Sequence, residues 1–242
     1  MKLFQRIFFA AVLAGLAAGI GMSALQHWKV APLILIAETY EGAAPAHEHA
    51  DAAAHEADGH THDAEAWAPA DGLERASYTV LANVLTSIGF GLLLAALSVL
   101  SGIGITARNG ALWGLGGFVA FQLAPAVGLP PELPGMAAAE LGARQLWWWG
   151  TALSTGAGLL AIAKFRNSIA VAAAALLILA PQIIGAPQLV AEHGSAVPAE
   201  LASAFAAATL AVGASLWLGM GPLLGWLNQR FAEAKSLKGA HA

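Results

Sequence analysis

Long apolar runs, separated by short polar stretches, are the dominant pattern along this chain of 242 residues. A helix needs about 20 mostly apolar residues to cross a bilayer. Six segments meet or approach that length with no Asp, Glu, Lys, Arg or His inside them, apart from Arg6 near the start of the first. The segments are residues 4–26, 79–103, 111–129, 146–163, 168–187 and 201–227. We therefore predict an all-α integral membrane protein with about six transmembrane helices.

The charged residues indicate how these helices are oriented. Lys and Arg accumulate in short cytoplasmic loops. With a cytoplasmic N-terminus, six spans place eight of the eleven basic residues in the cytoplasm and fourteen of the fifteen acidic residues on the other side. The cytoplasmic basic residues are then Lys2, Arg6, Arg108, Lys164, Arg166, Arg230, Lys235 and Lys238. We therefore expect a protein of the cell inner (cytoplasmic) membrane with both termini in the cytoplasm.

A second interpretation of the first segment stays open. Lys2 and Arg6, followed by an apolar stretch and a weak small-residue site near Ser23–Ala24, are also typical of a cleaved signal peptide. The apolar stretch is longer than the usual 7 to 15 or so residues, which favours a retained helix. Cleavage at this site would leave five spans, and the polar segment that follows the first span would still lie on the non-cytoplasmic side.

Composition divides the chain into four parts. Of its residues 58% are hydrophobic and only 11% are charged, which is typical of membrane proteins. We expect the first helix and its outer end in residues 1–40, a non-cytoplasmic loop rich in His, Asp and Glu in 41–76, a five-helix region in 77–229 and a cytoplasmic tail in 230–242. The loop cannot bury a core, so we expect it to be disordered without a ligand.

The loop predicted for residues 41–76 carries candidate metal ligands. It holds five of the eight histidines, interleaved with acids and alanines: His47, His49, His55, His60 and His62. Imidazole and carboxylate suit Co²⁺, Ni²⁺ and Zn²⁺ without selecting strongly among them. Because histidine is neutral above a pKa of about 6.5, the loop should bind metal at neutral pH and release it on acidification. The alternative is that the loop is a solvated linker that binds no metal.

Three residues outside that loop are further candidates for metal ligands. His27 and His193 stand at the predicted outer ends of helices, where a histidine can ligate an ion or contact lipid headgroups. Glu132 is the only acid in a proline-rich turn after the third span, and a rigid turn can hold a carboxylate over a pore. A solvated acid is the alternative for Glu132.

An Ala-Pro pair recurs at the predicted outer level, as Ala31–Pro32, Ala124–Pro125 and Ala180–Pro181. Three helical hairpins, each turning near such a pair, would form a repeat of the kind that transporters build around a substrate site. The second and third prolines cannot donate to the carbonyl four residues earlier. Gln122 and Gln182 lie near those carbonyls and are candidate pore-lining residues. The alternative is that these prolines have no role in a pore, because proline is common in transmembrane helices.

Glycines recur four residues apart in three of the predicted helices. The pairs are Gly15 with Gly19, Gly110 with Gly114, and Gly221 with Gly225. This spacing places both glycines on one helix face, where the missing side chains let two backbones approach closely. We expect helix contacts at these pairs.

Several chemistries are excluded by what the sequence lacks. With no cysteine the chain forms no disulfide, thiolate metal site or iron–sulfur cluster. It has no Gly-x4-Gly-Lys-Ser/Thr loop for ATP, and its predicted spans hold no carboxylate or histidine for a proton relay. We expect no enzyme activity, no resident cofactor and no nucleic-acid partner. A divalent ion moving inward through 100 mV gains about 4.6 kcal/mol, which suffices for uptake without other coupling.

Three stretches carry a resemblance to a known family. They are Gly-Leu-Pro-Pro-Glu-Leu-Pro-Gly at residues 128–135, Arg144–Gln145 ahead of Trp147–Trp148, and Ala-Pro-Gln at 180–182. Over nearly its whole length the chain resembles the CbtA family of predicted cobalt-transporter subunits. The resemblance implies cobalt uptake for cobalamin synthesis and a small single-span partner, CbtB, that bears a histidine-rich tail.

Three functions follow as hypotheses. The favoured one is a subunit for cobalt uptake, with nickel and zinc as alternative ions: the loop captures the ion, passes it toward His27, Glu132 and His193, and the bundle conducts it inward. The second is a non-conducting metal-binding or anchoring subunit of a transporter complex. The third is a membrane metalloenzyme, which would need a fixed site of three or four ligands. We expect the lipid bilayer and a CbtB-like subunit as partners, with the oligomeric state left open.

Overall fold

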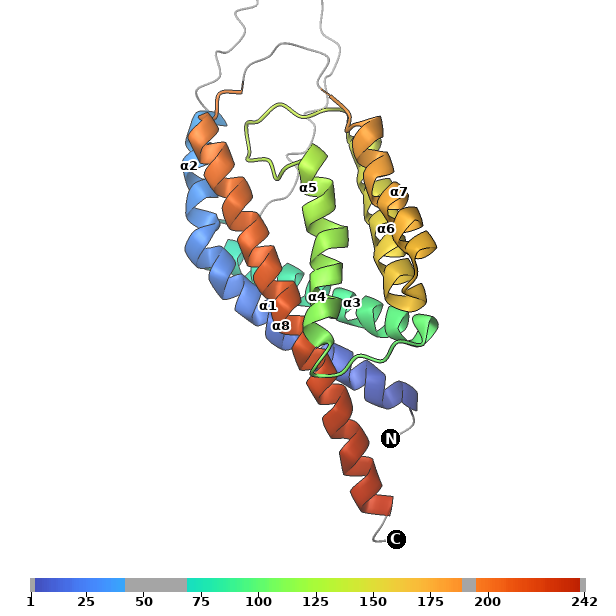
Figure 1. The fold of residues 1–242 in the computed structure, drawn as a ribbon. Helices are drawn as coiled ribbons and strands as arrows, with labels where there is room; N and C mark the ends of the chain where they lie inside the picture. The colour runs from blue at the N-terminus through green and yellow to red at the C-terminus, as the bar shows by residue number, and fades with distance from the viewer. Residues whose placement is uncertain (1–2, 42–68, 189–194, 240–242) are drawn as a thin grey trace, which may run out of the picture.

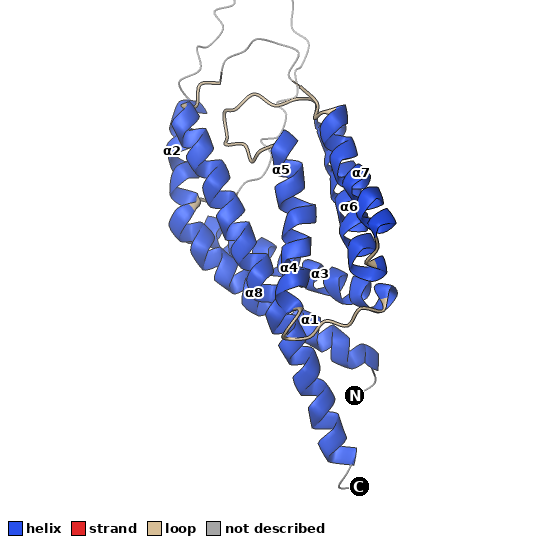
Figure 2. Ribbon diagram, in the orientation of Figure 1, coloured by secondary structure: helices blue, strands red, loops and turns tan. Residues whose placement is uncertain are grey.

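The computed structural model describes residues 3–41, 69–188 and 195–239, and these residues are helical wherever they form regular structure (Figure 2). The α-helices are α1 (Leu3–Lys29), α2 (Ala31–Glu41), α3 (Leu73–Ser101), α4 (Gly110–Phe118), α5 (Ala124–Gly128), α6 (Leu141–Phe165), α7 (Ser168–Ile184) and α8 (Ala199–Gly239). A π-helical turn, η1 (Val119–Leu123), joins α4 to α5. The predicted all-α class is confirmed.

Each of the six predicted apolar segments coincides with a helix or a continuous run of helices, and three of them extend one to three residues past its C-terminal end. Four stretches are long and apolar enough to cross a membrane: Leu3–Lys29, Leu73–Ser101, Gly110–Gly128 and Ala199–Glu233. Helix α6 has 25 residues but carries several Trp, Gly, Ser and Thr residues, and α7 has only 17 residues. The chain therefore has four clear candidate spans, and a count of six remains a prediction.

At two places the helices extend further than the predicted spans. The chain bends at Val30 and continues as α2 through Glu41, so residues 31–40 are helical where the sequence indicated only an outer end. Pro32 does not prevent this, because a proline in the first turn of a helix has no N–H that needs a partner. At the other end α8 continues to Gly239, so most of the predicted tail is helix.

The helices pack in an order different from the predicted three hairpins. Helix α1 packs against α3 as expected, but α7 packs against α6, and α8 packs against α1 and α4. The Ala-Pro pairs also do not mark turns. Ala31–Pro32 begins α2, Ala124–Pro125 begins α5 within a continuous helical run, and Pro181 lies inside α7. The two termini lie at one end of the molecule and the loop of residues 129–140 at the other (Figure 1).

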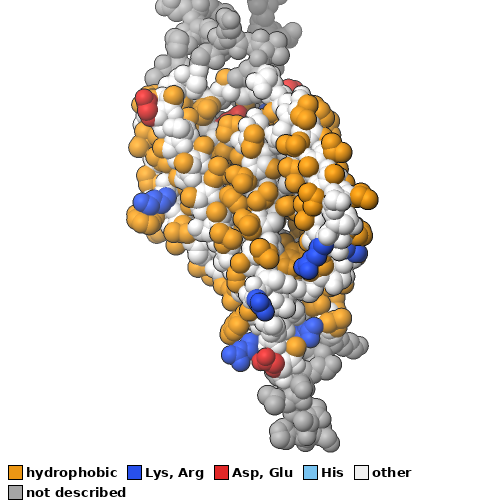
Figure 3. All heavy atoms as spheres, viewed as in Figure 1, with side chains coloured by type: hydrophobic (Ala, Val, Ile, Leu, Met, Phe, Trp, Pro, Cys, Tyr) orange, Lys and Arg blue, Asp and Glu red, His pale blue; other side chains and the backbone are white. Residues whose placement is uncertain are grey.

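Large apolar side chains point outward and small ones fill the helix contacts. Leu146 is 76% exposed and Ile183 is 81% exposed, whereas Ala10, Ala11 and Ala14 are fully buried. The face in Figure 3 is covered with hydrophobic side chains over its middle, and most of its Lys and Arg side chains lie toward the end that holds the termini. An apolar surface with small residues at the contacts fits helices that are solvated by lipid.

Glycines let the paired helices approach to backbone contact, as the four-residue spacing predicted. A Cβ built on Gly15 of α1 would lie 2.5 Å from the Ile88 Cα of α3. On α8, a Cβ at Gly221 would lie 2.1 Å from the Gly110 carbonyl oxygen of α4. Since real Cβ atoms do not approach so closely, a larger residue would push these helices apart.

We expect Gly114→Ala in α4 to destabilise the protein by about 1–3 kcal/mol through overpacking. A Cβ there would lie 2.1 Å from the Trp217 carbonyl oxygen of α8. Gly116→Ala is the matched control, because no heavy atom lies within 4 Å of a Cβ at that position of the same helix. Unfolding of the purified protein in detergent measures both, and equal stability of the two variants would contradict the proposed contact.

Candidate functional site

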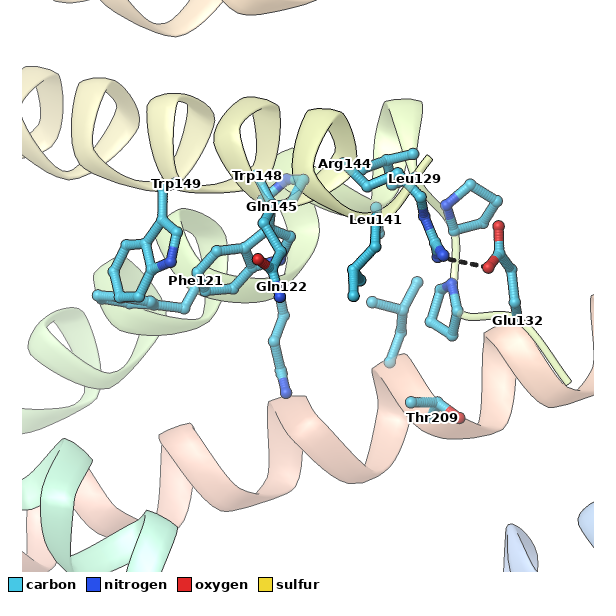
Figure 4. A pocket seen from close by; sticks show the side chains of 15 residues that line it. Phe121, Gln122, Leu129, Glu132, Leu141, Arg144, Gln145, Trp148, Trp149 and Thr209 are labelled. Atoms are coloured by element: carbon cyan, nitrogen blue, oxygen red, sulfur yellow. Dashed lines mark hydrogen bonds and ion pairs between the residues drawn. The ribbon is translucent and has the colours of Figure 1, made fainter. Parts of the chain in front are cut away.

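A cavity of about 390 Å³ lies between α5, the start of α6, α8 and the loop of residues 129–140. Aromatic side chains form one side of it in Figure 4, and an acid and a base face each other on the opposite side. The polar side chains that line the cavity are Gln122, Glu132, Arg144, Gln145 and Thr209. It is therefore an amphipathic cavity with one acidic and one basic residue in its lining.

A widened helical turn places one wall of the cavity. The Ala124 N–H donates to the Val119 carbonyl, five residues earlier, as in a π-helix. Pro125 follows directly and has no N–H to donate to the Phe121 carbonyl, so the regular α-helical ladder cannot pass through this point. The π-turn includes Phe121 and Gln122, and both side chains line the cavity. Such turns occur often at functional sites.

The proline-rich loop holds Glu132 in a defined place. Glu132 Oε2 accepts a hydrogen bond from the Arg144 guanidinium, twelve residues later on α6, and the two side chains are only 24% and 26% exposed. The next residue, Leu133, is buried in a cluster with Val30, Ala37 and Phe205. Because Leu133 is anchored in the core and Arg144 in a helix, the Glu132 carboxylate is fixed on the cavity wall.

Two further hydrogen bonds join α5, α6 and α7 beside the cavity. Trp147 Nε1 of α6 donates to the Pro181 carbonyl of α7 at 3.1 Å, and Gln182 Nε2 of α7 donates to the Ala124 carbonyl at 2.9 Å. Gly128 packs under the Trp147 ring, since a Cβ there would lie 2.6 Å from it. Gln182 therefore braces the wall and is not among the residues that line the cavity.

Aromatic rings close the inner end of the cavity. The Phe121 ring stacks on Trp217 with centroids 5.8 Å apart, and the Phe90 ring contacts both, at 4.7 Å from Trp217 and 5.5 Å from Phe121. Trp148 lies 6.1 Å from Phe121. Trp217 is fully buried, so the floor of the cavity is a packed aromatic cluster.

Two oxygen atoms near the cavity accept no hydrogen bond from the described part of the chain. Thr209 Oγ1 and Gln122 Oε1 are both buried and lack a partner. The Gln122 amide lies against Gly213 of α8, where a Cβ would come within 1.9 Å of its Oε1. Any side chain at position 213 would therefore displace Gln122.

The remaining sequence-predicted ligands do not meet at this cavity. His47, His49, His55, His60, His62 and His193 lie outside the described residues. His27 is exposed in the last turn of α1, and the chain continues directly after it as α2 for eleven residues. Residues 3–41, 69–188 and 195–239 contain no group of three or more His, Asp or Glu side chains that could hold a metal ion together.

Sequence reasoning missed the partners of Glu132. Arg144, Gln145 and Trp148 appeared in the stretches that carry the family resemblance, but their spacing does not reveal that they surround one cavity. Thr209 gave no signal, because a threonine in an apolar helix is ordinary. These residues could be assigned only once α6 and α8 were placed around α5.

The loop of residues 129–140 leads into α6, and the first turn of this helix is capped. Glu140 is the N-cap of α6, and its carboxylate accepts hydrogen bonds from the Gly142 and Ala143 N–H groups at 2.7 and 2.6 Å. These backbone hydrogen bonds lower the pKa of the Glu140 carboxyl, because they favour its charged form. The cap is fully formed at neutral pH and is lost as the pH falls through this lowered pKa. It fixes where α6 begins, just before Arg144.

Comparison with known proteins identifies one family. The family model described as "Probable cobalt transporter subunit (CbtA)" matches residues 4–229, which is nearly the whole chain. The matched range includes every residue that lines the cavity. No curated protein and no solved structure matches this chain.

We expect Trp147→Phe to destabilise the protein by about 1 kcal/mol, since it removes a hydrogen bond between α6 and α7 and leaves the Pro181 carbonyl with the Gly185 N–H as its remaining donor. Trp149→Phe is the matched control. That ring is 52% exposed, and no hydrogen bond joins its Nε1 to the described residues. Thermal unfolding in detergent compares the two, and an equal loss in both variants would contradict the role of the Trp147 hydrogen bond.

Proposed function

The chain belongs to the CbtA family of probable cobalt transporter subunits, and from this premise we propose that it takes up cobalt through the cavity beside Glu132. The histidine-rich loop captures the ion on the non-cytoplasmic side, the cavity receives it, and the helix bundle conducts it inward. Nickel and zinc are competing ions, because imidazole and carboxylate ligands do not exclude them.

One observation carries this proposal: the stretches that resemble the family converge on one place. The turn of residues 128–135 contributes Glu132, the start of α6 contributes Arg144 and Trp148, and Gln182 braces the wall from α7. These residues lie far apart in the sequence. Their convergence on a cavity with an acid in its wall supports a shared role in ion passage.

The charge distribution supports an inward direction. Most Lys and Arg side chains visible in Figure 3 lie toward the end of the molecule that holds the termini, and the loop of residues 129–140 lies at the opposite end in Figure 1. By the positive-inside rule the termini are cytoplasmic, which puts the cavity and the histidine-rich loop outside. An ion captured there would be drawn inward by the membrane potential, with about 4.6 kcal/mol for two charges at 100 mV.

The aromatic floor requires a movement before an ion can pass. Phe121 and Trp217 stack directly below the cavity, and Trp217 is fully buried. In the proposed cycle this state is open to the outside and closed to the inside. Separation of η1 from α8 would part the two rings and open a path past Gln122, whose amide lies against α8.

A non-conducting subunit of a cobalt transporter is the second candidate. Two observations favour it: the family is described as a transporter subunit, and the cavity ends on packed rings. In that case a CbtB-like partner would supply or complete the path. The chain would then bind cobalt and deliver it to the partner.

We expect replacement of the five loop histidines by glutamine to lower cobalt uptake several-fold at limiting cobalt and to leave it unchanged at saturating cobalt. The reason is that the loop raises the local cobalt concentration but does not form the path. Uptake of labelled cobalt is measured in cells that lack their own cobalt uptake and express the chain. A variant with five loop alanines changed to glutamine is the control and should take up cobalt as the wild type does. If cells that express the wild-type chain take up no more cobalt than cells without it, the proposal is contradicted.

A further inference from the structure

We propose that the cavity holds the cobalt ion with its hydration shell intact, so that cavity side chains accept hydrogen bonds from the coordinated waters and do not bind the metal directly. This inference rests on the proposed function and specifies the form of the ion at that site. It follows from the volume of the cavity, from the side chains that line it and from the charge of its wall.

The cavity has room for a hydrated ion, and its lining lacks the ligands for a bare one. Six waters occupy about 180 Å³ at roughly 30 Å³ each, which the cavity of about 390 Å³ accommodates. Direct coordination needs ligand atoms only about 2.0–2.2 Å from the metal, converging from several sides. The described lining residues offer one carboxylate and no histidine, so they do not provide such convergence.

The lining has the wrong ligands for direct coordination and suitable ones for contacts through water. Among the described residues, Glu132 is the only acid that lines the cavity, and no histidine does. Of the other side-chain oxygens, that of the Gln145 amide belongs to the lining, whereas Gln122 Oε1 and Thr209 Oγ1 are themselves buried from solvent. Amide and hydroxyl oxygens bind transition metals weakly but accept hydrogen bonds readily from water polarised by a metal ion.

The ion pair in the wall leaves one acceptor free. Arg144 engages Glu132 through Oε2, and no described residue donates to Oε1. The second carboxylate oxygen can therefore accept from a coordinated water without breaking the ion pair. Because the one acid and one base of the lining cancel, the cavity holds a divalent cation only weakly, which suits passage better than storage.

Hexaamminecobalt(III) tests this inference directly. Its six ammine ligands do not exchange, so it can bind only through its N–H groups, and it is close in size to a hydrated cobalt ion. We expect it to inhibit Co²⁺ uptake competitively in liposomes that contain the full chain. We also expect it to bind the purified protein in calorimetric titration, which does not depend on transport.

Substitutions in the ion pair of Glu132 and Arg144 test whether the complex binds in this cavity. Glu132→Gln should weaken binding of hexaamminecobalt(III) about fivefold, because it removes the only negative charge, and Arg144→Gln should tighten binding about fivefold. Glu200→Gln is the matched control, since Glu200 lies exposed in the first turn of α8 and does not line the cavity. It should leave binding unchanged.

The outcomes separate this inference from the proposed function. Co²⁺ uptake that proceeds normally while the complex neither inhibits nor binds would overturn the hydrated-ion site and leave the uptake function in place. Equal binding of the complex to the wild type and to Glu132→Gln would also overturn it. Binding that depends on Glu132, without Co²⁺ uptake by any form, would support the site and contradict conduction by this chain alone.

Discussion

Backbone contact between α4 and α8 at glycines is the constraint on which the rest of this structure depends. Gly110 and Gly114 of α4 meet Gly221 and Trp217 of α8 at distances that exclude a Cβ. This contact brings α8 against the widened turn that follows α4. As a result Gly213 receives the Gln122 amide, Thr209 joins the cavity wall, and Trp217 stacks on Phe121 beneath it. Without the close approach, neither the wall nor the floor of the cavity would exist.

Prolines, which have no backbone N–H to donate, shape the region around the cavity. Pro125 interrupts the α-helical ladder, and the π-turn beside it directs Phe121 and Gln122 into the cavity. The prolines of residues 130–134 make the turn that carries Glu132, and Leu133 anchors this turn in the core. The result is a carboxylate held opposite aromatic rings, at the end of the molecule away from the termini (Figures 1 and 4).

Much of the fold could be predicted from the sequence, because lipid imposes a simple rule on helix length and composition. The apolar runs located the helices, and the glycine spacing located two of their contacts. The extension of α1 into α2 was missed because Ala31–Pro32 indicated a break, although proline is tolerated in a first helical turn. The ion pair of Glu132 with Arg144 was also missed, since it spans a loop of irregular backbone that no periodicity describes. The packing of α7 on α6 instead of α8 depends on side-chain fit that spacing alone does not encode.

The most direct measurement of the central claim is labelled cobalt flux into liposomes that hold only this purified chain, with the potential negative inside. The account predicts cobalt entry that increases with the potential and falls when Glu132 is replaced by glutamine. Cobalt that binds to the protein but does not enter at any potential would contradict it. The chain would then be an accessory subunit whose partner completes the path.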